Sequence, residues 1–270
     1  MTYTQILYDK SDRIATITLN RPEALNAYTE QMGTEMLSAF KDAETDTNVG
    51  AVVLAGAGRA FCGGADVKGW DRDVQDLKKA VEEKPKRTLV LPRSPRDSLL
   101  HYMLQMSKPI LAAVHSHAVG IGATMILPCD IRIVAETARI GFIFVRRGVT
   151  PEFGSTYLLP RIVGFSKAKE LCLTARVIGA QEAKEIGLAN QIVPEAELLS
   201  AAKEMARGIA AAPPIAIAFT KRGLNLSLQS TLDQMLEFEY WAFATCQNSE
   251  DFEESVRAFV EKREPRFQGR

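Results

Sequence analysis

Short apolar segments separated by helical patterns constrain the fold of this chain more than any other feature. The segments "VGAVVLAGAG" (49–58), "KPILAAV" (108–114) and "DIRIVAE" (130–136) have the length and apolar character of buried strands. Between residues 29 and 43 apolar side chains recur at helical spacing, and "GIGATMILP" (120–128) is typical of a helix with a glycine-rich start. Strands that alternate with helices predict an α/β fold with parallel sheets.

Two regions depart from this alternation. Residues 71–98 are dense in charge and contain prolines, so we expect a solvated insertion there, with a mobile wall over a site as the alternative. After about residue 200 the pattern is helical, with a largely apolar face that must cover the chain's own core or another subunit's. We therefore predict a core at 1–200 and a C-terminal helical oligomerisation region at 201–270.

The charge balance and the cysteine spacing exclude several classes of function. Lys and Arg together number 33, as do Asp and Glu, so no net charge attracts the chain to nucleic acid or to an anionic membrane. The four cysteines lack the spacing of a zinc site or a disulfide framework, so we expect no metal and a reducing compartment. No apolar run approaches the ~20 residues of a membrane span, and the start "MTYTQILYDKSDR" lacks a signal-peptide core. We expect a cytoplasmic protein.

Two patterns that resemble functional motifs are better explained otherwise. "VGIGATM" (119–125) follows a strand pattern, but it lacks the third glycine and the later acidic residue of a dinucleotide-binding fingerprint. His115 and His117 would lie on opposite faces of an extended segment, which favours structural or surface roles over catalysis. Phosphate-loop and serine-hydrolase motifs do not occur.

Two glycine-rich turns each follow an apolar strand pattern: "GRAFCGGADVKGW" (58–70) and "HSHAVGIGATM" (115–125). Small residues let a ligand approach the backbone, and the N–H groups in the first turn of a helix have no intrahelical acceptor. Two such turns brought together could direct two N–H donors at one oxygen, which is an oxyanion hole.

Several motifs in order resemble the enoyl-CoA hydratase/isomerase (crotonase) superfamily. They are "NRPEALNA", "AFCGGADVK", "KPILAAVHSHAVGIGATMILPCDIRI", "PRIVGFSKAKEL" and "ARVIGAQEAKEIGLANQIV". The resemblance implies a spiral of ββα turns, a C-terminal helical trimerisation region, and homotrimers or homohexamers. It also implies an acyl-CoA thioester as the substrate, so that coenzyme A is part of the substrate and no separate cofactor is expected.

The same resemblance implies roles for individual residues. The thioester oxygen would be held by the N–H groups of Ala65 and Ile121. Phe259 and Lys262 match positions that can reach coenzyme A, often across a subunit contact. The other residues expected to bind substrate are Ala24, Gly63, Asp66, Lys68, Thr124 and Phe144.

The chain departs from the hydratase pattern at three of these positions. Hydratases of the family carry two glutamates that hold the water, and here Thr124 and Phe144 occupy those places. Syn-addition of water needs groups that position the water and move its proton, and these two side chains do not supply that pair. Ile121 stands where hydratases often have glycine, so its side chain is expected to narrow or redirect the pocket.

Glu152 is the one acidic residue in "RRGVTPEFGSTYLLPR" (146–161). In the resemblance it falls where isomerases, some thioester hydrolases and a dehalogenase place an acidic residue. A carboxylate beside Phe142, Phe144 and Phe153 would have a raised pKa, as a general base requires. The alternative is that Glu152 caps a helix starting near Phe153.

We therefore predict an isomerase that converts a 3-enoyl-CoA to the 2-enoyl-CoA, with Glu152 as its acid and base. Three alternatives stay open: a hydrolase of a thioester or carbon–carbon bond, an enoyl-CoA hydratase, and an acyl-CoA-binding protein without turnover.

Overall fold

The computed structural model describes residues 2–66 and 98–270. In these residues six strands form the main sheet in the order β1-β2-β3-β4-β6-β9, antiparallel between β1 and β2 and parallel from β2 onward. The strands predicted from apolar runs are β3, β4 and β6, and their parallel pairing confirms the α/β prediction. The main-sheet strands are β1 (Ile6–Ser11), β2 (Ile14–Leu19), β3 (Ala51–Gly56), β4 (Ile110–Val114), β6 (Ile131–Ala135) and β9 (Gln191–Val193).

A second, smaller sheet adjoins the first. Its strands are β5 (His117–Val119), β7 (Arg139–Gly141) and β8 (Val177–Gly179), with β5 parallel to β7 and β7 antiparallel to β8. The chain passes from β4 of the main sheet to β5 through a two-residue connection. The glycine-rich segment that follows β5 is therefore anchored to both sheets.

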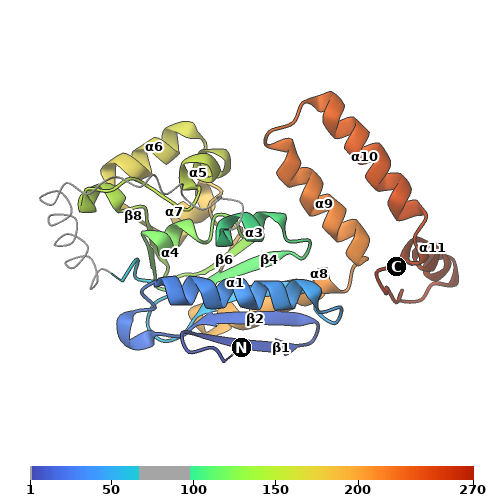
Figure 1. Cartoon of the computed structure of the whole chain (residues 1–270), viewed down its shortest axis with the longest axis horizontal. Coiled ribbons are helices and arrows are strands. Elements are labelled where there is room, and N and C mark those ends of the chain that lie inside the picture. Colours follow the sequence, from blue (N-terminus) through green and yellow to red (C-terminus); the bar gives the residue numbers. More distant parts are fainter. Residues whose placement is uncertain (1, 67–97) are drawn as a thin grey trace, which may run out of the picture.

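Helices cover both faces of the main sheet (Figure 1). Alternate residues of β3 belong to two apolar clusters, one shared with α1 (Glu30–Thr45) and α3 (Leu99–Gln105) and the other with α8 (Leu198–Ala210). Burial on both faces explains why the parallel strands have continuous apolar sequences. The side chain of Thr29 caps α1 by accepting a hydrogen bond from the Met32 N–H.

The helix predicted at 120–128 is shorter in the structure. It forms α4 (Ile121–Thr124), after which the chain continues in turns. Pro128 explains part of this difference, because a proline disfavours helical geometry at the residue before it. The remaining short elements are α5 (Ser155–Val163), α6 (Phe165–Thr174), α7 (Ala180–Glu185), η1 (Pro22–Ala24), η4 (Phe144–Arg147) and η5 (Glu195–Glu197).

The C-terminal helices are α9 (Pro214–Ser227), α10 (Leu232–Gln247) and α11 (Glu250–Glu261). Figure 1 shows α9 and α10 side by side, projecting from the core, with α11 after the end of α10 and close to the start of α9. The boundary expected near residue 200 falls within α8, which packs on the main sheet, so the projecting part begins with α9.

The insertion expected at 71–98 lies outside the described residues apart from Ser98. That side chain caps α3 by accepting a hydrogen bond from the His101 N–H. Among the described residues, no helix combines the length and apolar character needed to cross a membrane.

Candidate active site

The two glycine-rich turns pack directly against each other. The Cys62 N–H donates to the His117 carbonyl at 2.9 Å, and the Val119 N–H donates to the Cys62 carbonyl at 3.1 Å. Gly122 allows this approach, because a Cβ atom there would lie 2.5 Å from the Cys62 carbonyl oxygen. The two glycine-rich turns, which are far apart in the sequence, are thus in direct contact in the fold.

A glycine with positive φ precedes each candidate oxyanion donor. Gly64 has φ +110° and is followed by Ala65, and Gly120 has φ +56° and is followed by Ile121. Side chains are strained at such φ values, so glycine suits both turns. Ile121 is the first residue of α4, where an N–H has no intrahelical acceptor. Within residues 2–66 and 98–270, neither the Ala65 N–H nor the Ile121 N–H donates a hydrogen bond.

Glu152 contacts the same short helix. The Thr124 hydroxyl donates a 2.8 Å hydrogen bond to Glu152 Oε1. Thr124 is fully buried and lies three residues after Ile121, which places both on one face of α4. The structure therefore brings Ala65, Ile121, Thr124 and Glu152 into one arrangement.

The surroundings of Glu152 raise the pKa of its carboxyl group. Burial of its carboxyl group raises its pKa above the ordinary glutamate value, and the hydrogen bond from Thr124 opposes this rise. The residue as a whole is exposed, although its carboxyl group lies among protein atoms, so the site is open to solvent on one side. The pKa of Tyr28 is also raised, by burial first and then by the negative charge of Glu152.

The helix-cap interpretation of Glu152 is wrong. The helix that follows is α5, which begins at Ser155 after Gly154, and no side chain among the described residues caps it. The Ser155 N–H donates to the main-chain carbonyl of Glu152, while the carboxylate binds Thr124. Phe153 has φ +54°, a strained conformation for an aromatic residue, and it lies between Glu152 and α5.

An apolar cluster adjoins this arrangement. Phe142 and Phe144 are buried in the cluster that contains Ile121, and Phe153 packs partly against it. Gly154 is fitted closely to α3, because a Cβ atom there would lie 2.6 Å from the Leu100 side chain. These contacts fix the segment that carries Glu152.

The segment around η1 lies beside the Ala65 turn. The Gly63 N–H donates to the Leu25 carbonyl at 2.8 Å, next to Ala24. Arg21, which the sequence analysis missed, forms a 2.9 Å ion pair with Asp66. The only signal for Arg21 was its place in the "NRPEALNA" motif.

Tyr28 is a second residue that sequence reasoning missed. Its main-chain N–H donates to the Gly64 carbonyl, and its carbonyl accepts from the Asp66 N–H, so it holds the Ala65 turn from both sides. Lys68, expected to bind substrate, lies outside the described residues.

The comparisons with known proteins agree on one family. The family model described as enoyl-CoA hydratase/isomerase matches residues 9–270. The chain belongs to this family. It is 36% identical to the short-chain-enoyl-CoA hydratase of Clostridium acetobutylicum over 97% of both chains, and 34% identical to the 1,2-epoxyphenylacetyl-CoA isomerase of Escherichia coli over 95% of both.

Solved structures show the same fold. The crystal structure of a putative enoyl-CoA hydratase from Streptomyces coelicolor A3(2) superposes with a TM-score of 0.88 at 32% identity, covering 100% of this chain and 96% of the other. The α/β crotonase fold predicted from the sequence motifs is thus confirmed. The names of the relatives indicate hydration more often than isomerisation, so they establish the enoyl-CoA hydratase/isomerase family without selecting the isomerase reaction.

Two residues expected to bind coenzyme A in this enoyl-CoA hydratase/isomerase family member lie away from Glu152 within one chain. Phe259 is in the last turn of α11, and Lys262 ends that helix. Figure 1 places α11 on the opposite side of the chain from α4 and α5. A single chain therefore does not bring Phe259 or Lys262 to the carboxylate.

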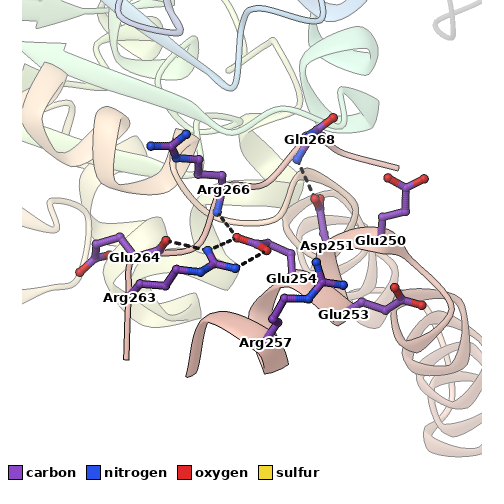
Figure 2. A pocket seen from close by; sticks show the side chains of 9 residues that line it. All are labelled: Glu250, Asp251, Glu253, Glu254, Arg257, Arg263, Glu264, Arg266 and Gln268. Atoms are coloured by element: carbon purple, nitrogen blue, oxygen red, sulfur yellow. Dashed lines mark hydrogen bonds and ion pairs between the residues drawn. The ribbon is translucent and has the colours of Figure 1, made fainter. Parts of the chain in front are cut away.

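A charged pocket lies between α11 and the C-terminal segment (Figure 2). Glu254 accepts hydrogen bonds from both terminal nitrogens of Arg263, at 2.6 and 2.8 Å, and Asp251 accepts the main-chain N–H groups of Gln268 and Gly269. These bonds fasten the C-terminal segment to α11. Among the described residues no cluster of three or more His, Cys, Asp or Glu side chains could hold a metal ion.

Proposed function

We propose that this acyl-CoA-transforming enzyme moves a carbon–carbon double bond of an enoyl-CoA from C3 to C2, with Glu152 as both acid and base. The supporting observation is a single carboxylate with a raised pKa that is hydrogen-bonded to the helix carrying a candidate oxyanion donor. Perturbed carboxylates beside pre-arranged N–H donors are typical of catalytic sites.

The geometry suits a 1,3-proton shift. The N–H groups of Ala65 and Ile121 would hold the thioester oxygen and stabilise the negative charge that develops on it. Glu152 takes a proton from C2, and the electron pair of that bond forms a dienolate with the C3–C4 double bond. Protonated Glu152 then gives the proton to C4, which leaves a double bond between C2 and C3 and restores the thioester carbonyl. One carboxylate completes both steps.

Hydration is the second candidate, and the names of the relatives favour it. Addition of water to a 2-enoyl-CoA needs groups that hold the water and move its proton. Thr124 offers a hydroxyl that is already bound to Glu152, and Phe144 offers no hydrogen-bonding group. The side chains at these two positions therefore favour isomerisation over hydration.

A substrate panel separates these reactions. Purified protein is incubated in deuterated water with 3-enoyl-CoA and 2-enoyl-CoA thioesters of varied length, branching and ring content. Isomerisation predicts the 2-enoyl product without 3-hydroxyacyl-CoA and without free thiol, and deuterium enters C4 only to the extent that protonated Glu152 exchanges with solvent before it returns the proton. Hydroxyacyl-CoA as the main product would favour the hydratase, and release of free coenzyme A would favour the hydrolase. Unchanged substrate, with no product and no deuterium at C2, would indicate binding without turnover.

A further inference from the structure

The hydroxyl of Thr124 has one proton and two acceptors within reach. It lies 2.8 Å from Glu152 Oε1 and 3.3 Å from the Ile121 carbonyl. That carbonyl already accepts the Met125 N–H at 2.8 Å. A bond to an ionised carboxylate is stronger than one to a neutral carbonyl, so the hydroxyl proton belongs to Glu152.

The two oxygens of Glu152 therefore differ. Oε1 is held by Thr124, while Oε2 accepts no hydrogen bond from any group in residues 2–66 and 98–270. A carboxylate held by one oxygen has a fixed orientation, and its second oxygen keeps its lone pairs for another proton. Because Oε1 is occupied by Thr124, Oε2 is the oxygen that is left to accept a proton.

Glu152 also lacks a regular element of its own. It lies in an irregular segment between η4 and α5, and residues 145–150 just before it are exposed. Thr124, in contrast, is fully buried on α4, the helix that begins with Ile121. The hydrogen bond consequently ties the carboxylate to the element that presents an oxyanion donor.

We propose that Thr124 is a positioning residue that fixes Glu152 relative to the Ile121 N–H and reserves Oε2 for the substrate proton. The proposal rests on the function proposed above, because it assumes that Glu152 exchanges a proton with the acyl-CoA. Thr124 then supports proton transfer by Glu152, and its presence means more than the loss of the glutamate that hydratases have at this position.

The bond should also affect the pH dependence of turnover. Tyr28 is the titratable group among the described residues whose pKa responds to the charge of Glu152, and burial keeps Tyr28 protonated. The Thr124 bond lowers the pKa of Glu152 against the effect of burial. Without the Thr124 bond, Glu152 should ionise at a higher pH. The acidic limb of the profile of kcat against pH should therefore move to higher pH.

The test compares Thr124→Val, which removes the hydroxyl at nearly constant volume, with Thr124→Ser, which keeps it. The assay is exchange of the C2 proton of acyl-CoA in deuterated water, together with turnover of the best substrate in the panel. Misplacing a catalytic group by about 1 Å costs on the order of 100-fold in rate. We expect Thr124→Val to lower kcat by ~10–100-fold, to change KM much less, and to move the acidic limb upward. Thr124→Ser should recover most of the lost rate.

A double-mutant cycle with Glu152→Gln distinguishes positioning from general damage. If Thr124 acts through Glu152, Thr124→Val should cost little further rate in the Glu152→Gln background. A wild-type kcat and pH profile for Thr124→Val, or equal impairment of the Ser and Val variants, would overturn the proposal. Where Thr124→Val fails to fold, the Ser variant and Thr124→Ala, compared in the same cycle, decide the question. Full activity of Glu152→Gln would instead overturn the proposed function itself.

Discussion

At the residue scale, the site combines one glutamate that is easy to find with a partner that is not. Glu152 could be predicted because it is a lone carboxylate in a basic and apolar stretch. Its bond to Thr124 joins residues 28 positions apart, and only the approach of the two segments in the fold creates it. The sequence drew attention to Thr124 only because a hydratase has a glutamate there. Nothing in the sequence shows which group accepts the hydrogen bond of a threonine hydroxyl.

The raised pKa of Glu152 has a consequence for stability. Burial disfavours its charged form, so ionised Glu152 makes the native state less stable as pH rises through its folded pKa, and this effect is absent below the ordinary glutamate pKa. We expect Glu152→Gln, which can still accept from Thr124, to raise Tm at neutral pH. The gain should disappear near pH 4, as thermal unfolding across pH would show. A lower Tm for the variant at pH 7 would contradict the assigned environment. The exposed control Glu204→Gln should not change Tm.

At the element scale, the strands that could be predicted from the sequence were the longer ones that are buried on both faces. The long apolar strands β3, β4 and β6 were predicted, because a strand buried on both faces has a continuous apolar sequence. The three-residue strands β5 and β7 were not, since such short segments show no periodicity. Both glycine-rich turns were recognised, but their mutual contact depends on tertiary pairing.

Gly122 tests that contact. A methyl group at this position would press on the Cys62 backbone, so we expect Gly122→Ala to destabilise the protein by ~1–3 kcal/mol, as overpacking does, and to lower activity. The matched control is Gly208→Ala in α8, where an added Cβ meets nothing within 4 Å. There alanine should be neutral or stabilising by up to ~1 kcal/mol. Denaturant unfolding measures both, and equal stability of the two variants would show that the turns tolerate separation.

At the scale of the whole molecule, the C-terminal helices expose large apolar side chains. Tyr240 is 82% exposed and Phe243 66% exposed on α10, and Phe259 is 84% exposed on α11. Exposure of this extent on one region is typical of a surface that another subunit covers. We propose a homotrimer or homohexamer in which these helices form contacts. Phe259 and Lys262 are distant from Glu152 within one chain. In such an assembly they would instead approach the coenzyme A bound to a neighbouring subunit.

Light scattering tests the assembly. The wild-type protein is expected at the mass of three or six chains, and Phe243→Arg on α10 should shift it toward the monomer. The control Leu7→Arg, at an exposed apolar residue of β1, should leave the mass unchanged. Activity should fall with dissociation if coenzyme A contacts cross between subunits. A stable, active wild-type monomer at micromolar concentration would contradict this assembly.

The most direct test of the account is the turnover of Glu152→Gln on a 3-enoyl-CoA substrate. The variant keeps the size of the side chain and an oxygen for Thr124, and it removes the negative charge together with the ability to exchange a proton. A general base contributes ~10²–10⁴-fold, so we expect kcat to fall by that factor while the protein stays folded and still binds acyl-CoA. A loss of less than about tenfold, which is below that range, in a folded variant would contradict the role of Glu152 as the acid and base.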